Sequence, residues 1–328
     1  MRIALMAALL SATVAGAQSP SSAQSPAGVL IAGNKRANTA SVVDLASGRT
    51  LAELPTPPGP HESAVSSNGR WGVITGYGTQ QPGNTLLIID LPIAAAVRTI
   101  DLGEYRRPHG IAFLPGDSLI AVTVEANQAV LVVHRERGVV RAIHTGEQAT
   151  HQMAVRPDGV LGYTANIRSG TITEVNFANG AARSLAVAPE VEGISVTPDG
   201  REVWVGSNTA GTISIVDVAT WKVIATLDQG ERPYRVNISP DGKLAAAALT
   251  IRSRIRLIDV ATRKEIALLE APANAQPVGM TWSADGKRLY VACQGINAIA
   301  EFDVASRRLV RTIAVGDGPD GVAVAERR

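Results

Sequence analysis

Three of the five histidines in this 328-residue chain recur at a nearly constant spacing. His61, His109 and His151 follow one another at intervals of about 40 to 50 residues, a length typical of structural repeats, and Glu192 continues the series. Neutral imidazoles and a carboxylate are ligands that Zn²⁺, Fe²⁺, Mn²⁺ and Cu²⁺ accept in proteins. If the fold brings these four side chains to one level, they form a divalent transition-metal site at which a bound water is activated.

The same spacing continues to the end of the chain, through Tyr234, Val278 and Asp320. Glu192 is predicted to be a metal ligand or a general base, and Tyr234 and Asp320 are candidates to orient a substrate or a water. The alternative is that these polar residues only begin strands beside water. The other two histidines, His134 and His144, are expected to be solvated strand residues.

A tight turn accompanies most of these positions. Six copies can be aligned: "SSNGR" at 66, "LPGDS" at 114, "RPDGV" at 156, "TPDGR" at 197, "SPDGK" at 239 and "SADGK" at 283. Asp-Gly and Asn-Gly pairs are typical of hairpin turns. Apolar strands flank each turn, and alternating segments such as "TISIVDV" and "WKVIATL" add two further strands to each unit. The Ala-rich "PIAAAVRT" occupies the place of "ATWKVIAT" and is therefore predicted to be a turn and a strand.

Units of four strands that recur at this period predict an all-β, seven-bladed β-propeller over residues 28–328. After Asp320 only "GVAVAERR" remains, which is one strand, whereas "GVLIAGN" near the start opens a unit that lacks its first strand. Joining the two completes a blade and removes the open sheet edges. Since the first strand of every propeller blade lines the central channel, the recurring residues are expected to form a ring.

The N-terminal segment predicts export. Arg2, an apolar run from Ile3 to Leu10 and an A-x-A site ending at Ala17 are typical of a signal peptide over residues 1–17. Residues 18–27 are expected to be a flexible leader. A periplasmic or secreted protein without a membrane span in its mature chain follows. Its single cysteine, Cys293, cannot form an internal disulfide, so packing must hold the fold together.

A second set of residues is basic. In each blade, the loop after the second strand and the segment before the first strand are expected on the same face of the propeller as the ring of recurring residues. Together they carry Lys35, Arg36, Arg106, Arg107, Arg168, Arg232, Arg235, Arg252 and Arg254. Such a collar would attract a small anionic molecule. The ligand-binding residues predicted from it are Arg107, Arg168, Arg232, Arg235 and Arg252, together with Tyr77 in an enlarged loop next to His61. The alternative is that these are ordinary charges of exposed loops.

The repeats resemble a known family. "GYTAN" at 162, "RLYVAC" at 288 and "SPDGK" followed by "IDVAT" are similar to the YVTN-repeat propellers, exported proteins of bacteria and archaea, over residues 28–328. The resemblance implies the propeller fold and leaves function open, because family relatives include scaffolds, nucleic-acid binders and, more distantly, lactonases and lyases.

Two functions remain from these patterns. The first is a metal-dependent hydrolase or lyase that acts on a small anionic or lactone-like substrate. The second is a non-catalytic binding propeller that engages a protein, an envelope polymer or nucleic acid through its basic face. Nucleic acid is the less favoured partner, because the formal net charge is only +2, and we expect a monomer.

Overall fold

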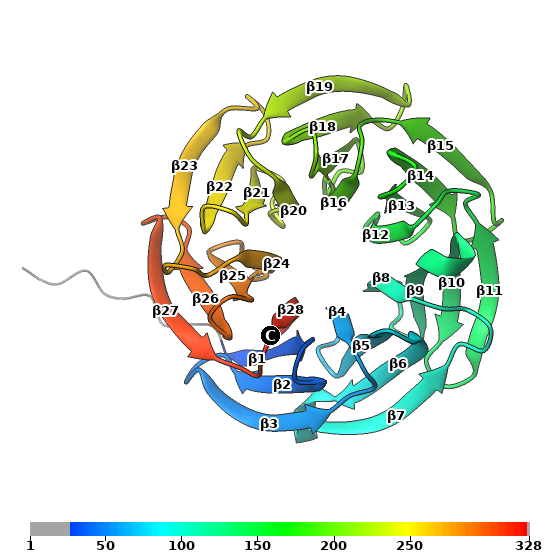
Figure 1. The fold of residues 1–328 in the computed structure, drawn as a ribbon, viewed down its shortest axis with the longest axis vertical. Helices are drawn as coiled ribbons and strands as arrows, with labels where there is room; N and C mark the ends of the chain where they lie inside the picture. Colours follow the sequence, from blue (N-terminus) through cyan, green and yellow to red (C-terminus); the bar gives the residue numbers. More distant parts are fainter. Residues whose placement is uncertain (1–26, 327–328) are drawn as a thin grey trace, which may run out of the picture.

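The computed structural model describes residues 27–326 and contains seven four-stranded antiparallel sheets. Figure 1 shows them as blades around a central channel, so the predicted all-β, seven-bladed β-propeller is confirmed. The predicted signal peptide and the leader, residue 27 excepted, lie outside the described residues. Within the described part of the chain, no helix has the length and apolar character needed to cross a membrane.

Each blade runs from an inner to an outer strand. Blades 1 to 4 comprise β28 (Pro319–Glu326), β1 (Gly28–Asn34), β2 (Thr39–Asp44) and β3 (Arg49–Pro55); β4 (Pro60–Val65), β5 (Trp71–Gly78), β6 (Pro82–Asp90) and β7 (Ala95–Asp101); β8 (Pro108–Phe113), β9 (Leu119–Val124), β10 (Ala129–His134) and β11 (Gly138–His144); and β12 (Thr150–Val155), β13 (Leu161–Asn166), β14 (Thr171–Asn176) and β15 (Ala182–Ala186). Blades 5 to 7 comprise β16 (Val191–Val196), β17 (Glu202–Ser207), β18 (Thr212–Asp217) and β19 (Lys222–Asp228); β20 (Pro233–Ile238), β21 (Leu244–Leu249), β22 (Arg254–Asp259) and β23 (Glu265–Glu270); and β24 (Pro277–Trp282), β25 (Arg288–Cys293), β26 (Ala298–Asp303) and β27 (Arg308–Ala314).

The last strand closes the ring. β28 pairs antiparallel with β1, in a register that runs from Gly28 opposite Glu326 to Asn34 opposite Pro319. The first blade therefore consists of one C-terminal and three N-terminal strands, as predicted. The edge of β1 that faces the channel is therefore paired with β28, and hydrogen bonds between strands from both ends of the described chain close the ring.

Three segments of blades 2 and 3 fold differently from simple loops. The Ala-rich segment forms the short 3₁₀-helix η1 (Leu91–Ile93) and then β7, which confirms the predicted turn and strand. The enlarged loop is a hairpin, because β5 and β6 continue until Gly78 pairs with Pro82. A second 3₁₀-helix, η2 (Glu125–Asn127), connects β9 with β10 on the face where the inner strands begin.

The repeated turns are held by their own side chains. In the turn at 239, the Ser239 hydroxyl donates to Asp241 at 2.7 Å, and the backbone amide of Leu244 donates to the same hydroxyl oxygen at 2.9 Å. Between blades, large side chains such as Trp204, Tyr290 and Phe302 are fully buried. Cys293 is buried with them, and this burial raises the pKa of its thiol to about 12, so the thiol packs as a small apolar group.

The inner strands carry an irregularity that decides which side chains meet the channel. In all seven, the pairing with the second strand shifts register at the predicted ring position. In blade 3, Pro108 pairs with Val124 and Ile111 with Val122, which leaves one extra residue on β8. Such β-bulges re-aim side chains, so two consecutive residues of an inner strand can both face the channel.

Glycine occupies the next position in several inner strands. A Cβ at Gly279 would lie 2.0 Å from the carbonyl oxygen of Asp320, and one at Gly321 would lie 2.4 Å from that of His61. No side chain fits at these distances. Neighbouring inner strands therefore come into close contact just below the ring, and the channel narrows there.

Candidate functional site

The ring predicted from the repeat spacing exists at one level of the channel. His61, His109, His151, Glu192, Tyr234, Val278 and Asp320 are each the second residue of an inner strand. A pocket of about 700 Å³ opens above them, and its walls include the three histidines, Glu192 and Tyr234. We call this pocket the funnel. Val278 is buried against Leu30 and Tyr290 instead, and Asp320 is 1% exposed.

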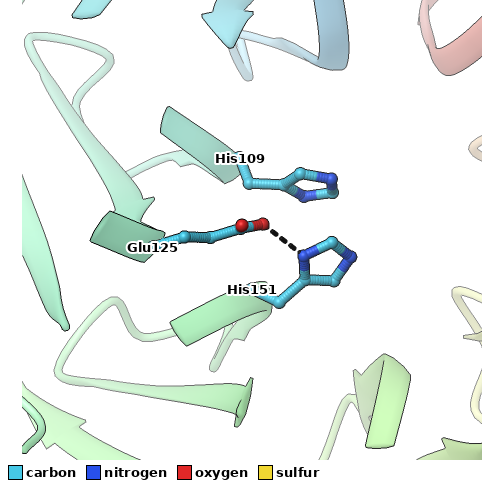
Figure 2. Close-up of side chains that lie close together, drawn as sticks. All are labelled: His109, Glu125 and His151. Atoms are coloured by element: carbon cyan, nitrogen blue, oxygen red, sulfur yellow. Dashed lines mark hydrogen bonds and ion pairs between the residues drawn. The ribbon is translucent and has the colours of Figure 1, made fainter. Parts of the chain in front are cut away.

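Two of the predicted histidines meet a carboxylate at this level. The imidazoles of His109 and His151 and the carboxylate of Glu125 each offer a ligand atom, and these atoms lie within 4.8 Å of one another. Figure 2 shows the three side chains converging from two neighbouring blades, with Glu125 hydrogen-bonded to Nδ1 of His151. The ring centroids of the histidines are 3.7 Å apart. We call this group the His-His-Glu cluster.

His61 lies beside this cluster. Its ring stacks on Tyr77 with centroids 4.2 Å apart and meets His109 edge-on at 5.1 Å, while its Nδ1 contacts the carbonyl oxygen of Gly59 at 3.0 Å. Burial, together with the charge of Glu125, raises the pKa of the Tyr77 phenol. The phenol therefore stays protonated, and its O–H donates a hydrogen bond to Oε2 of Glu125, with 2.7 Å between the two oxygens. Tyr77 thus connects His61 with the carboxylate of the cluster.

Glu192 contacts the other side of His151. Its Oε1 lies 3.5 Å from Nε2 of His151 and accepts a hydrogen bond from Arg235 at 2.8 Å, and its Oε2 accepts one from Asn208. Arg235 also donates to Oε1 of Glu62 at 2.6 Å. The prediction that His61 and Glu192 are metal ligands stays a prediction.

Arg235 differs most from its predicted place. It does not belong to an exposed collar but is 6% exposed beneath the funnel, where it lines a second cavity of about 370 Å³ on the far side. The cause is the bulge at Tyr234, which lets Tyr234 face the funnel and Arg235 lie beneath it. We call this second cavity the lower chamber; among the described residues, none lines both cavities.

The cluster separates the protonation states of its two histidines. Burial lowers the pKa of His109 well below its usual value, so this ring is neutral. Burial would also lower the pKa of His151, but its hydrogen bond to Glu125 and the nearby carboxylate of Glu192 raise it to about 9. Burial raises the pKa of Glu192, yet His151 and Arg235 bring it down to about 2. At neutral pH the metal-free site holds an imidazolium between two carboxylates.

The stability of the metal-free protein is expected to depend on this imidazolium. The pKa of His151 lies above its unfolded value of 6.5, so its contribution is complete below pH 6.5 and is lost as the pH rises through 9. The contribution of Glu192 is present above pH 4.5 and is lost as the pH falls toward 2. We expect the melting temperature in a chelator to fall between pH 6.5 and 9, and His151→Gln to flatten that slope. An unchanged slope in His151→Gln, with His144→Gln as the control, would contradict this assignment.

The remaining basic residues are divided between the funnel and the outer surface. Lys35, Arg36 and Arg107 line the funnel, and Arg168 lines an adjoining pocket together with Tyr77 and His151. Arg107 has a φ of 60° and stacks its guanidinium over Tyr77 at 4.7 Å, and Arg232 stacks over Tyr234 at 5.1 Å. Several members of the predicted collar pair with acidic groups: Arg36 of the funnel with Asp317, and outside the funnel Arg252 with Glu231 and Arg254 with Glu270.

Glu125 is not among the residues predicted from the sequence, although the repeats contain a signal for it. In blade 3, the first residue of the inner strand, Pro108, pairs with Val124, and Glu125 is the next residue along the chain. Lys35, Tyr77 and Asn208 hold the equivalent position in their blades. All four contact a ring residue: Lys35 lies 3.7 Å from Asp320, Tyr77 stacks on His61, and Asn208 bonds Glu192. This position forms a second ring, and aligning it across the repeats would have placed Glu125 beside the histidines.

Comparison with known proteins supports the fold and assigns a family. Hydrazine synthase from Kuenenia stuttgartiensis is similar in structure, with a TM-score of 0.73, 17% sequence identity and coverage of 90% of this chain and 99% of that chain. At this identity the similarity supports the propeller fold alone. No match was found among the curated proteins. The family model of the choice-of-anchor I domain matches residues 95–317, and since this is most of the chain, the propeller belongs to the choice-of-anchor I domain family.

Proposed function

We propose that the funnel binds a divalent transition metal through His109, His151 and Glu125 and uses it as a hydrolase or lyase on a small anionic or lactone-like substrate. The observation that carries the proposal is the convergence of two imidazoles and a carboxylate within 4.8 Å at the base of the funnel. Two histidines and one carboxylate are a donor set that leaves coordination positions open for water and substrate. His61, whose ring meets that of His109 edge-on at 5.1 Å, is the next candidate to complete the set.

Unsatisfied polar atoms support the fit. Nδ1 of His109 and Nε2 of His151 are buried and have no hydrogen-bond partner. Buried polar atoms normally have a partner, so two incompletely bonded imidazoles indicate that a ligand or water is missing from the site; the nearest oxygens to these nitrogens belong to Glu62 and Glu192, at 4.0 and 3.5 Å. A bound metal would act as a Lewis acid and lower the pKa of a coordinated water. Tyr77 would hold Glu125 in place, and Tyr234 is the predicted residue for orienting the substrate.

The walls of the funnel indicate the charge of the substrate. Lys35, Arg36 and Arg107 lie on the walls, where Lys35 is 3.7 Å from Asp320 and Arg36 pairs with Asp317. Glu192 at the base is neutralised by Arg235 and His151. A pocket of about 700 Å³ with these three cations in its lining favours a small anion over a neutral compound. We also propose that the protein is periplasmic or secreted, that it is a monomer, and that it is related to the YVTN-repeat proteins.

Metal analysis tests the proposal directly. Protein purified without a histidine tag should contain stoichiometric Zn, Fe, Mn or Cu, or should bind one of these metals when the chelated protein is titrated. A folded protein that takes up none of the four contradicts the proposal. The metal that restores hydrolysis of a lactone or ester panel would then identify the chemistry.

A binding function is the second candidate, and the basic wall of the funnel together with the family description "choice-of-anchor" favours it. In this version the propeller holds a protein or envelope polymer without catalysis, with nucleic acid as the less favoured ligand. Binding of a polyanion such as heparin should then weaken as salt rises and should weaken further in Arg107→Ala, because screening removes charge–charge attraction. The same binding should survive His109→Ala. Loss of binding in His109→Ala, with the fold intact, would contradict this candidate.

A further inference from the structure

A buried ion network lies directly beneath the His-His-Glu cluster. Arg235, in blade 6, donates through one terminal nitrogen to Glu192 of blade 5 at 2.8 Å and through the other to Glu62 of blade 2 at 2.6 Å. All three residues are less than 9% exposed. The guanidinium therefore joins carboxylates from both sides of the channel, and its planar fork fixes their relative positions.

Each of these carboxylates faces one histidine of the cluster. Glu192 lies 3.5 Å from Nε2 of His151, and Oε1 of Glu62 lies 4.0 Å from Nδ1 of His109. In metal sites, a histidine ligand commonly donates the N–H of its other nitrogen to a carboxylate, which fixes the orientation of the ring. Here each carboxylate faces a histidine nitrogen that has no hydrogen-bond partner of its own, at 4.0 Å for Glu62 and 3.5 Å for Glu192, and one arginine holds both carboxylates.

Glu125 and Glu192 both lie next to His151, but the positively charged group that each carboxylate contacts is of a different kind. Glu125 contacts Nδ1 of His151, a nitrogen that gives up its proton when the ring binds a metal. Glu192 contacts Arg235, whose guanidinium stays protonated in proteins. A cation placed against Glu192 would therefore lie next to a fixed positive charge, whereas one placed between Glu125 and Nδ1 would replace a proton.

We propose that Arg235, Glu192 and Glu62 are positioning residues that orient His151 and His109 for the metal, and that Glu192 is not itself a ligand. This inference rests on the proposed metal site. The ion network of Arg235, Glu192 and Glu62 then contributes to metal affinity. An ion network that only stabilised the fold would leave metal affinity unchanged.

Cobalt titration tests the inference, because the visible absorption of Co²⁺ reports its coordination geometry. The variants are Arg235→Lys, which keeps the charge but loses the fork, and Glu192→Gln, which keeps the shape but loses the charge. The matched control is Arg288→Lys. Arg288 is also buried and pairs with Glu301 and Asp303 on β26 of blade 7, so its replacement weakens a comparable ion network elsewhere in the ring.

We expect Arg235→Lys and Glu192→Gln to bind Co²⁺ roughly 10- to 100-fold more weakly than the parent, with a changed absorption band, as is usual for residues that support metal ligands. Arg288→Lys should lower the melting temperature and leave both properties unchanged. Parental affinity and spectrum in both channel variants would overturn the inference. So would complete loss of binding in Glu192→Gln, which would identify Glu192 as a ligand. If Arg235→Lys does not fold, Glu192→Gln decides alone.

The two proposals fail in different ways. A parent protein that binds no Co²⁺ removes the proposed metal site and this inference with it. A parent that binds Co²⁺ tightly, with channel variants that bind it equally well, removes only the inference.

Discussion

The His109→Ala and Glu125→Gln proteins should lose their bound metal, whereas the His144→Ala protein should keep it. His109 and Glu125 belong to the group whose ligand atoms lie within 4.8 Å, and each substitution removes one of these ligand groups. Because even residues that only support ligands cost about 10- to 100-fold in affinity, we expect losses of more than about 100-fold here. His144 is exposed on the outer strand β11 and serves as the matched control.

The measurement is metal content by mass spectrometry, followed by Zn²⁺ titration of the chelated proteins at pH 7. Melting temperatures confirm that each variant is folded, which matters because His109 is almost fully buried. His61→Ala separates a fourth ligand from a stacking partner: a loss as large as that of His109→Ala would make His61 a ligand. A His109→Ala protein that retains metal with parental affinity would refute the proposed centre.

Removal of the C-terminal segment from Pro319 onward should prevent the formation of a stable ring. The truncation deletes β28 and exposes the edge of β1 that pairs with it from Gly28 to Asn34. It also removes buried Val322, Ala323 and Ala325 and the ring residue Asp320. Lost hydrogen bonds at about 1 kcal/mol each, added to lost apolar burial, approach the roughly 5–15 kcal/mol by which domains are stable. We expect an aggregating chain without a cooperative thermal transition.

A circular permutant is the control for this truncation. Gly28 and Glu326 are opposite each other in the pairing of β28 with β1, so a short turn can join the two strands. The permutant begins at Pro319, continues through this turn into β1 and ends at Gly318. It contains every strand, but its two ends lie between blades 7 and 1, and no blade is formed by strands from both ends of the chain. It should fold and bind metal as the parent does, with a lower melting temperature. A truncated chain as stable as the permutant would show that β28 is dispensable.

Much of the fold followed from the sequence because repetition supplies independent copies of one signal. Six aligned turns and a recurring period gave the number of blades, the strand order and the closing strand. The ring position was also predicted to the residue, since its members occupy the same place in every inner strand. A single copy, such as the segment around His109, carries none of this information.

The positions of Glu62 and Arg235 beneath the ring could not be predicted, because they depend on the β-bulges of the inner strands. In a regular strand, neighbouring residues point to opposite faces, so Glu62 and Arg235 would be expected to point away from the ring side chains. The extra residue in each inner strand breaks that alternation. The sequence predicts Arg235 in the basic segment that enters the inner strand, and it contains no repeat signal for Glu62. Glu125 was missed for another reason: it follows a strand, where a loop charge is unremarkable.

The narrowing of the channel below the ring determines how a bound molecule is exchanged. Inner strands in contact at Gly279 and Gly321, together with the buried Arg235 network, separate the funnel from the lower chamber. We therefore expect a molecule that enters the funnel to leave through the same mouth. If the site is catalytic, product departure and substrate arrival share one passage, and product should inhibit competitively. The residues that govern residence time are then Lys35, Arg36 and Arg107 at the wall of that passage.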